Sequence, residues 1–82
     1  MEERFFTVKA AWDREAGVWY VSESDVPGLV AEAATPQDLM TKLVALVPEL
    51  VALNRHLLDW EPMDELPIHL MTEQMERVRL DG

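Results

Sequence analysis

Alternating apolar and polar positions near the N-terminus predict a β-hairpin. Aromatic and β-branched residues, which strands favour, are frequent in residues 5–12 and again in residues 18–23. The segment between them ends in Gly17, which can supply the positive φ that a tight return into the sheet requires. In the first strand, one parity carries the better set of apolar side chains and is expected to face the core. Its members are Phe6, Val8, Ala10 and Trp12.

A turn and a short third strand are expected after the hairpin. Pro27 presets φ at one position of the turn, and Gly28 accepts the positive φ that a type II turn needs at the next. Residues 29–33 then have the composition of a short strand. The three strands would lie in one small sheet.

The start of a helix is marked directly after this strand. Thr35 is a favoured N-cap residue, and Pro36 suits the first helical position because its missing N–H would have no partner there. Asp38 follows three residues after the cap, where a carboxylate meets free N–H groups and the positive end of the helix dipole.

The longest apolar pattern predicts one helix over residues 36–58. Apolar residues recur three and four positions apart, and the stripe is wide enough to cover a face of a small sheet. The stripe consists of Leu39, Leu43, Leu46, Leu50, Leu53 and Leu57, flanked by Met40, Val44, Val47 and Val51. Leu43 and Leu50 are expected in the core. Pro48 removes one backbone hydrogen bond and predicts a kink; two separate helices are the alternative, but the stripe keeps its phase across Pro48.

The C-terminal third is expected to contain an acidic loop and a last strand. Residues 59–67 are rich in acids and Pro, and residues 68–72 read as a strand that runs on toward Val78. A short amphipathic helix over residues 71–80 is the alternative. With 82 residues and no second-domain boundary, the chain is expected to be one α+β domain over residues 1–82.

The charge balance limits the classes of molecule that the chain is expected to bind. Sixteen acidic against seven basic residues give a net charge of −9. Strong sequence-independent binding of DNA or RNA needs clustered Lys and Arg, and an anionic membrane surface needs the same, so both are disfavoured. A basic protein is the partner that this charge suits. The N-terminus lacks the pattern of a signal peptide, and no apolar run of about 18 residues is present, so the cytoplasm is the expected compartment.

Candidate chemistry is sparse, and no catalytic, cofactor-binding or metal site is predicted. The absence of cysteine excludes thiol nucleophiles and thiolate zinc sites. His56 with Asp59, or His69 with Glu73, would share a helix face, but two ligands do not make a zinc site.

A serine nucleophile is also disfavoured. Ser22, Ser24 and Asp25 lie close together, but no nucleophile motif surrounds them, and the polarity of a strand end explains them better. Glu23 beside Asp25 is explained by solubility and protection of a strand edge. The chain is therefore expected not to be an enzyme.

A partner interface is the functional site that the residues favour. Phe5, Val18 and Tyr20 would lie on the sheet face opposite the helix, where an apolar patch rimmed by charge is typical of an interface. The alternative is that the C-terminal tail folds over this face. A second part of the interface is expected in the acidic loop, whose carboxylates would speed encounter with a basic partner. These are Asp59, Glu61, Asp64 and Glu65.

Four short motifs, in this order and spacing, resemble the HicB-like group of small bacterial domains, and within it a subgroup described as a domain of unknown function. They are D-x-E-A-G-V-W at 13–19, S-D-V-P-G-L at 24–29, E-A-x-T-x-x-x-L at 32–39 and V-P-E-L-x-x-L-N at 47–54. The resemblance covers about residues 5–72. It implies a β-β-β-α-β fold, an antiparallel sheet with one long helix packed on one face.

The resemblance also implies a binding role. In HicB antitoxins this domain masks a small basic ribonuclease toxin, and a separate C-terminal region binds operator DNA. No separate DNA-binding domain is expected in this chain, and Ala33-Ala34 replaces the glycine-containing turn common before the helix in antitoxins. The expected function is therefore an antitoxin-like module that binds a basic protein. The alternative is a self-associating structural domain, a homodimer through the free sheet face.

Overall fold

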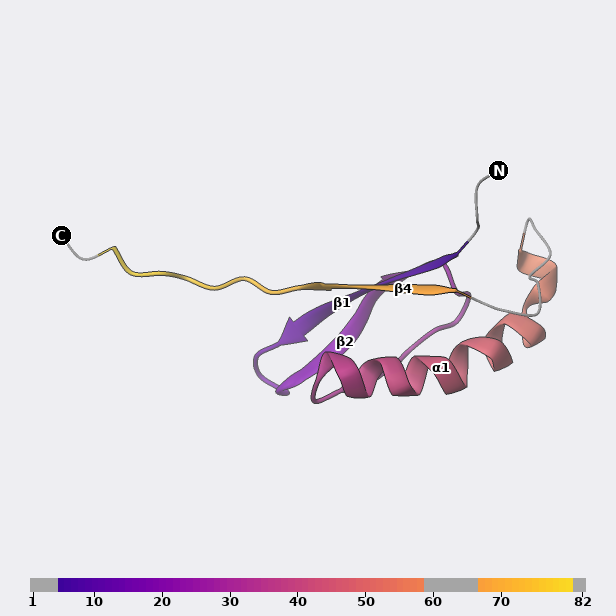
Figure 1. Cartoon of the computed structure of the whole chain (residues 1–82), viewed down its shortest axis with the longest axis horizontal. Helices are drawn as coiled ribbons and strands as arrows, with labels where there is room; N and C mark the ends of the chain where they lie inside the picture. The colour runs from indigo at the N-terminus through magenta and orange to yellow at the C-terminus, as the bar shows by residue number, and fades with distance from the viewer. Residues whose placement is uncertain (1–4, 59–66, 81–82) are drawn as a thin grey trace.

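Four strands form one sheet in the order β3-β2-β1-β4, and a long helix lies across one face of it (Figure 1). The computed structural model describes residues 5–58 and 67–80. The elements are β1 (Phe6–Asp13), β2 (Val18–Ser24), β3 (Glu32–Ala33), α1 (Pro36–Leu53), the 3₁₀ helix η1 (Arg55–Leu57) and β4 (Ile68–Glu73). The α+β class and the β-β-β-α-β order are those expected from the sequence.

The sheet is mixed, not antiparallel throughout. β1 pairs antiparallel with β2, and β2 with β3, as expected of a hairpin and its continuation. β4 instead pairs parallel with β1, from Phe6 opposite Ile68 to Ala11 opposite Glu73. The cause is the helix, because parallel strands need a crossover of about a dozen or more residues and α1 carries the chain back to the end of the sheet where β1 begins.

Both predicted glycine turns are confirmed. Gly17 has a φ of 69° and Gly28 a φ of 76°. The third strand is shorter than the expected 29–33, because only Glu32–Ala33 pairs regularly with β2. Leu29 belongs to the turn, where its N–H donates to the carbonyl of Val26, yet its side chain is buried.

The helix begins as predicted and ends earlier. The Thr35 hydroxyl accepts the N–H of Asp38 at 3.0 Å, and Pro36 is the first helical residue. The helix continues through Pro48, with its axis bending along the C-terminal half (Figure 1), but it ends at Leu53 instead of residue 58. Asn54 is the C-cap: its N–H makes the last helical bond to the carbonyl of Leu50, and its side-chain amide donates to the same carbonyl.

The buried line of α1 differs from the predicted leucine stripe. Leu39, Leu43, Val47 and Val51 are buried at strict four-residue spacing, and Leu50 is only half-buried. Leu53 and Leu57, predicted to be in the stripe, are exposed. Residues spaced four apart form a ridge that is inclined to the helix axis. Because α1 packs along this ridge, its first half buries leucines of the predicted stripe and its second half buries valines of the flanking row.

One apolar core lies between α1 and the sheet. Its buried residues are Phe6, Val8, Ala10, Trp19, Val26, Leu29, Ala33, Leu39, Leu43, Val47 and Val51. The predicted core parity of β1 is confirmed for the first three. Trp12 lies at the end of the strand and is 37% exposed, with its ring against that of Trp19.

The last described segment is an extended tail. β4 ends at Glu73, and residues 74–80 have neither the predicted strand running on toward Val78 nor the alternative helix. The tail leaves the sheet along the direction of β4 (Figure 1) and does not fold back over it. The last pair is Ala11 with Glu73, and β1 ends two residues later at Asp13, so residues 76–80 lie beyond the end of β1. Within the two described ranges, no helix has the length and apolar character to cross a membrane.

Candidate functional site

The sheet face opposite α1 carries no covering layer among the described residues, and we call it the open face. The register places on it every second residue of each strand. Its members are Phe5, Thr7, Lys9, Ala11, Val18, Tyr20, Glu23, Glu32, His69, Met71 and Glu73. The sequence analysis predicted this face as the interface, from Phe5, Val18 and Tyr20.

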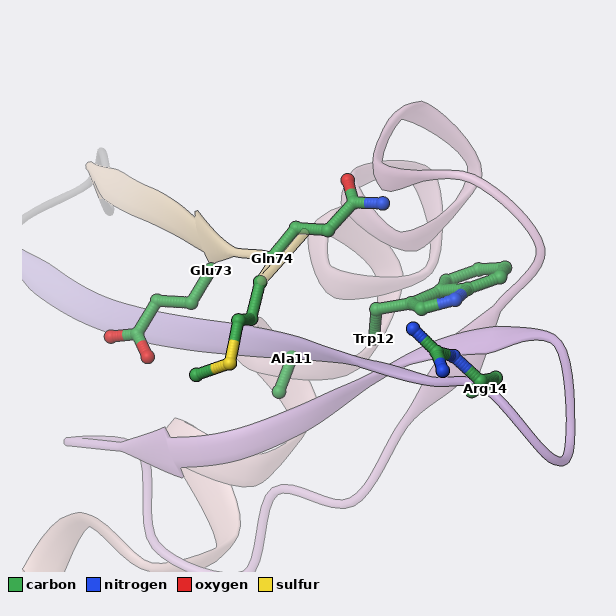
Figure 2. Close-up of a pocket in the computed structure, with 6 residues that line it drawn as sticks. Ala11, Trp12, Arg14, Glu73 and Gln74 are labelled. Carbon is green, nitrogen blue, oxygen red and sulfur yellow. The ribbon is translucent and has the colours of Figure 1, made fainter. Parts of the chain in front are cut away.

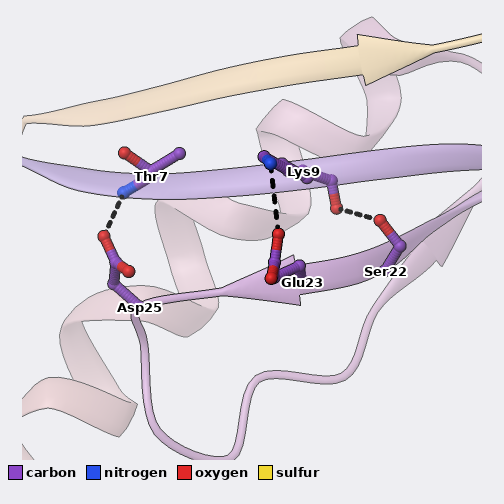
Figure 3. Close-up of polar contacts among 5 residues, drawn as sticks. All are labelled: Thr7, Lys9, Ser22, Glu23 and Asp25. Atoms are coloured by element: carbon purple, nitrogen blue, oxygen red, sulfur yellow. Dashed lines mark hydrogen bonds and ion pairs between the residues drawn. The ribbon is translucent and has the colours of Figure 1, made fainter.

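The centre of the open face is polar (Figure 3). The Lys9 ammonium lies 3.2 Å from the Glu23 carboxylate across the β1–β2 pair. Nearby, the Asp25 carboxylate accepts the backbone N–H of Thr7 at 3.1 Å, and the Asp25 N–H donates to the Thr7 carbonyl. These contacts fix the end of β2 against β1 and leave the ion pair facing outward.

A β-bulge accounts for one of the serines considered as nucleophiles. The register shifts between Lys9 and Ala10, so that Ser22 is an extra residue in β2. Its hydroxyl donates to the Lys9 carbonyl at 3.2 Å (Figure 3). The Ser22 hydroxyl therefore stabilises the bulge between β1 and β2.

Ser24 closes the turn that follows. Its hydroxyl accepts the N–H of Val26 at 2.8 Å and lies 3.2 Å from the Val26 carbonyl. Ser24 and Asp25 thus bond the backbone around the end of β2, as expected of strand-end polarity, whereas Ser22 lies at a bulge within the strand.

The predicted apolar patch is divided in two. At one end of the open face, Phe5 is 48% exposed and packs edge-on against His69, with ring centroids 5.7 Å apart. At the other end, Tyr20 is 40% exposed and lies opposite Ala11, with Val18 half-buried two residues away. Ala11 lies six positions after Phe5 along the chain, about 20 Å of strand. The structure thus brings Val18 and Tyr20 together but places Phe5 apart from them.

A groove at the hairpin end adds a residue that the sequence analysis missed. Trp12 and Arg14 line a hollow of about 390 Å³ together with Ala11 and the start of the tail, residues 73–75 (Figure 2). They also line a second hollow of about 580 Å³ that reaches Tyr20 and Glu32. The parity rule assigned Trp12 to the core, and the position of Trp12 directly before the loop is the signal that would have placed it at the rim.

The acidic part of the predicted interface cannot be placed on this surface. Asp59, Glu61, Asp64 and Glu65 lie outside the described residues. Glu23, Glu32 and Glu73 supply negative charge on the open face itself, and of these Glu23 is paired with Lys9.

Of the two histidine pairs considered as ligands, the structure places both members of one, His69 and Glu73. His69 and Glu73 lie on a strand, where four residues span about 13 Å, and not on a shared helix face. His56 is exposed in η1, and its partner Asp59 lies outside the described residues. Within residues 5–58 and 67–80, no group of three or more His, Asp or Glu side chains is arranged to hold a metal ion.

Comparisons with known proteins identify a family and one solved structure. The sequence model of a family described as "Domain of unknown function (DUF1902)" matches residues 5–81. The crystal structure of the hypothetical protein TTHA1013 from the extremely thermophilic bacterium Thermus thermophilus is similar, with 45% sequence identity and a TM-score of 0.66. The similarity covers 94% of this chain and 100% of that one. No curated protein matches the sequence significantly.

Proposed function

Because the chain belongs to the family of the domain of unknown function DUF1902, which assigns it no activity, we propose a function from the surface: a non-enzymatic module that binds a small basic protein through its open face. The observation that carries the proposal is a sheet face that no described residue covers and that exposes aromatic side chains at both ends.

The aromatic side chains would supply the contact area. Phe5, Tyr20 and the rim residue Trp12 are each more than one-third exposed. Aromatic residues are enriched at protein interfaces and carry much of the binding energy, because each buries a large area at a small entropic cost. Two aromatic ends about 20 Å apart suit a folded partner better than a small ligand, since such a partner can bridge both ends.

The charges supply the preference for a basic partner. The whole chain carries −9, and Glu32 and Glu73 lie on the open face. A field of one sign speeds the encounter with an oppositely charged protein and repels acidic ones. A second copy of this chain on the same face would bring these carboxylates toward each other, so the charges favour a basic partner over a homodimer through the open face.

The resemblance to HicB-like domains makes the partner more specific. By analogy with HicB antitoxins, the proposed partner is a small basic ribonuclease-toxin-like protein, and the proposed compartment is the cytoplasm. The chain would act by covering that protein.

The test is capture with surface variants in extracts of the native host. The wild-type chain, Tyr20→Asp and the control Val44→Asp are immobilised and cross-linked to bound proteins, which are identified by mass spectrometry. Val44 is 60% exposed on the helix side, so its variant adds the same charge away from the open face.

The expected result is one small basic protein that the wild type and Val44→Asp retain and Tyr20→Asp loses, with less capture as salt rises. Thermal melts of all three chains check that the fold is intact. Equal capture by Tyr20→Asp, or the absence of any basic partner, contradicts the proposal.

A further inference from the structure

The outer edge of β4 is unpaired in the described part of the chain. β4 pairs with β1 on one side only, from Ile68 to Glu73. Its backbone N–H and C=O groups on the other side are free to pair with another strand, and exposed edges of this kind are sites of association. Ile68 and Leu70, on its helix side, are only half-buried.

The tail that follows β4 is extended but is not paired as a strand with any described residue. Residues 74–80 are extended and exposed, and they continue the direction of β4 (Figure 1). Three of their side chains are large and apolar, with exposed fractions of 80% or more. These are Met75, Val78 and Leu80. Because these side chains bury little area in the single chain, little offsets the conformational entropy that the tail would lose on becoming ordered.

The tail has the parity of a strand that extends the sheet. Val78 and Leu80 share the even parity of Ile68 and Leu70, on the helix side of β4. Arg77 and Arg79 have the odd parity of the open face. If the tail paired as a strand, Val78 and Leu80 would therefore meet the core side and the two arginines the open side, whereas Met75 would lie on the open side and Glu76 on the core side.

We propose that two copies of this chain pair through their β4 edges, with the tail of each copy running antiparallel along β4 of the other. A two-fold axis at residue 74 places residues 75–80 of one copy opposite residues 68–73 of the other. Four strands from each copy would then form one continuous sheet.

In this register, two apolar residues of the tail lie opposite apolar residues of β4 on the helix side. Val78 lies opposite Leu70, and Leu80 opposite Ile68, so the half-buried residues of β4 gain apolar neighbours. On the open side, Arg77 lies opposite Met71 and diagonal to Glu73, within reach of a long side chain.

The partner of the β4 edge is a second copy of this chain, because one chain carries both surfaces of the contact, the free edge and the tail. The free edge and the matching strand are consecutive in sequence, which makes the contact self-complementary about a two-fold axis. The charge of the tail agrees with this choice, although the two whole chains of −9 repel each other. Arg77 and Arg79 against Glu76 give residues 74–80 a net charge of 2 − 1 = +1, so the rest of the chain carries −9 − 1 = −10. The contact uses the edge of the sheet and leaves the open face free, so it does not depend on the proposed function.

Sedimentation equilibrium of two matched variants tests the contact. Val78→Glu puts a carboxylate at the centre of the proposed apolar pairs, and Val30→Glu makes the same change at an equally exposed valine outside the tail and β4. We expect a dimer for the wild type and Val30→Glu, and at least a tenfold weaker dimer for Val78→Glu with an unchanged circular dichroism spectrum. A wild type that stays monomeric, or a Val78→Glu dimer as tight as the wild type, overturns the proposal.

A cysteine pair tests the register, since the natural chain has no cysteine. The double variant Leu70→Cys with Val78→Cys should form a disulfide-linked dimer on mild oxidation, and Leu70→Cys with Val30→Cys should not. A disulfide within one chain would mean that the tail folds back, and it would overturn the proposal. If Val78→Glu is monomeric and still binds a basic protein, the edge contact and the proposed function are separated.

Discussion

Single residues determine the stability of a turn and of a helix end in this domain. Gly28 has a φ of 76°, and a Cβ added there would meet only Leu50 Cδ2, at the ordinary contact distance of 3.9 Å. The requirement for glycine at this position is therefore conformational and not steric crowding from neighbours. Thr35 acts differently, because its hydroxyl accepts the N–H of Asp38, one of the first helical N–H groups that have no carbonyl four residues earlier in the helix.

Gly28→Val should lower the free energy of unfolding by about 1–3 kcal/mol, because a β-branched residue is strained at positive φ. Thermal denaturation measures the loss. Gly28→Asn is the matched control, since Asn tolerates this region better and should lose less. Equal melting temperatures for Gly28→Val and the wild type would contradict the conformational argument.

Thr35→Ala should cost about 1 kcal/mol, because the N–H of Asp38 loses its acceptor. Thr35→Ser keeps a hydroxyl at the same place and should retain most of the stability. Urea denaturation followed by circular dichroism compares the three chains, and an Ala variant as stable as the Ser variant would mean that the cap contributes nothing.

At the scale of the element, α1 shows how packing selects one row from a broad apolar pattern. The sequence offers a leucine row and a flanking row that includes three valines, and the sheet buries two leucines of the first row and two valines of the second. The helix ends at Leu53 because Asn54 caps it, although the apolar pattern continues to Leu57. The contribution of an apolar residue of α1 to stability therefore depends on whether its side chain faces the sheet, and not on how apolar that side chain is.

Leu43→Ala should lower the free energy of unfolding by about 2–5 kcal/mol, since Leu43 is fully buried and its loss leaves a cavity. Leu53→Ala removes the same atoms from a side chain that is 75% exposed and should change stability by less than about 0.5 kcal/mol. Leu50→Ala should fall between them. Chemical denaturation ranks the three, and a different order would mean that the helix faces the sheet in another phase.

At the scale of the whole molecule, the net charge of −9 and the incompletely covered sheet together determine how the chain associates with other proteins. A basic partner is attracted by the net charge, whereas a second copy of the chain is repelled by it and must be held by apolar pairs and backbone hydrogen bonds. The two proposed associations therefore respond to salt in opposite directions.

Self-association should tighten as sodium chloride rises from about 0.05 M to about 0.5 M, because screening weakens the repulsion between two chains of −9. Binding of a basic partner should weaken over the same range. Sedimentation equilibrium across the salt series measures the first, and surface plasmon resonance the second. A dimer that dissociates as salt rises would show that ion pairs, and not the apolar pairs, hold it.

The amino-acid sequence by itself determined the local structure of this protein. The hairpin, the glycines at positive φ, the Thr35 cap and the order of elements depend on contacts between neighbours in the chain, which propensity and spacing express directly. The open face and two of its aromatic residues also followed from strand parity, because a single helix covers only one side of a sheet.

Only the tertiary structure decided which distant segments meet. The parallel pairing of β4 with β1, the burial of Val47 and Val51, and the bulge at Ser22 arise from the fit of the helix and strands against each other. The same is true of the separation of Phe5 from Tyr20 and of the exposed tail after Glu73. Such features depend on register and on where neighbouring strands end, and residues far apart in sequence set both.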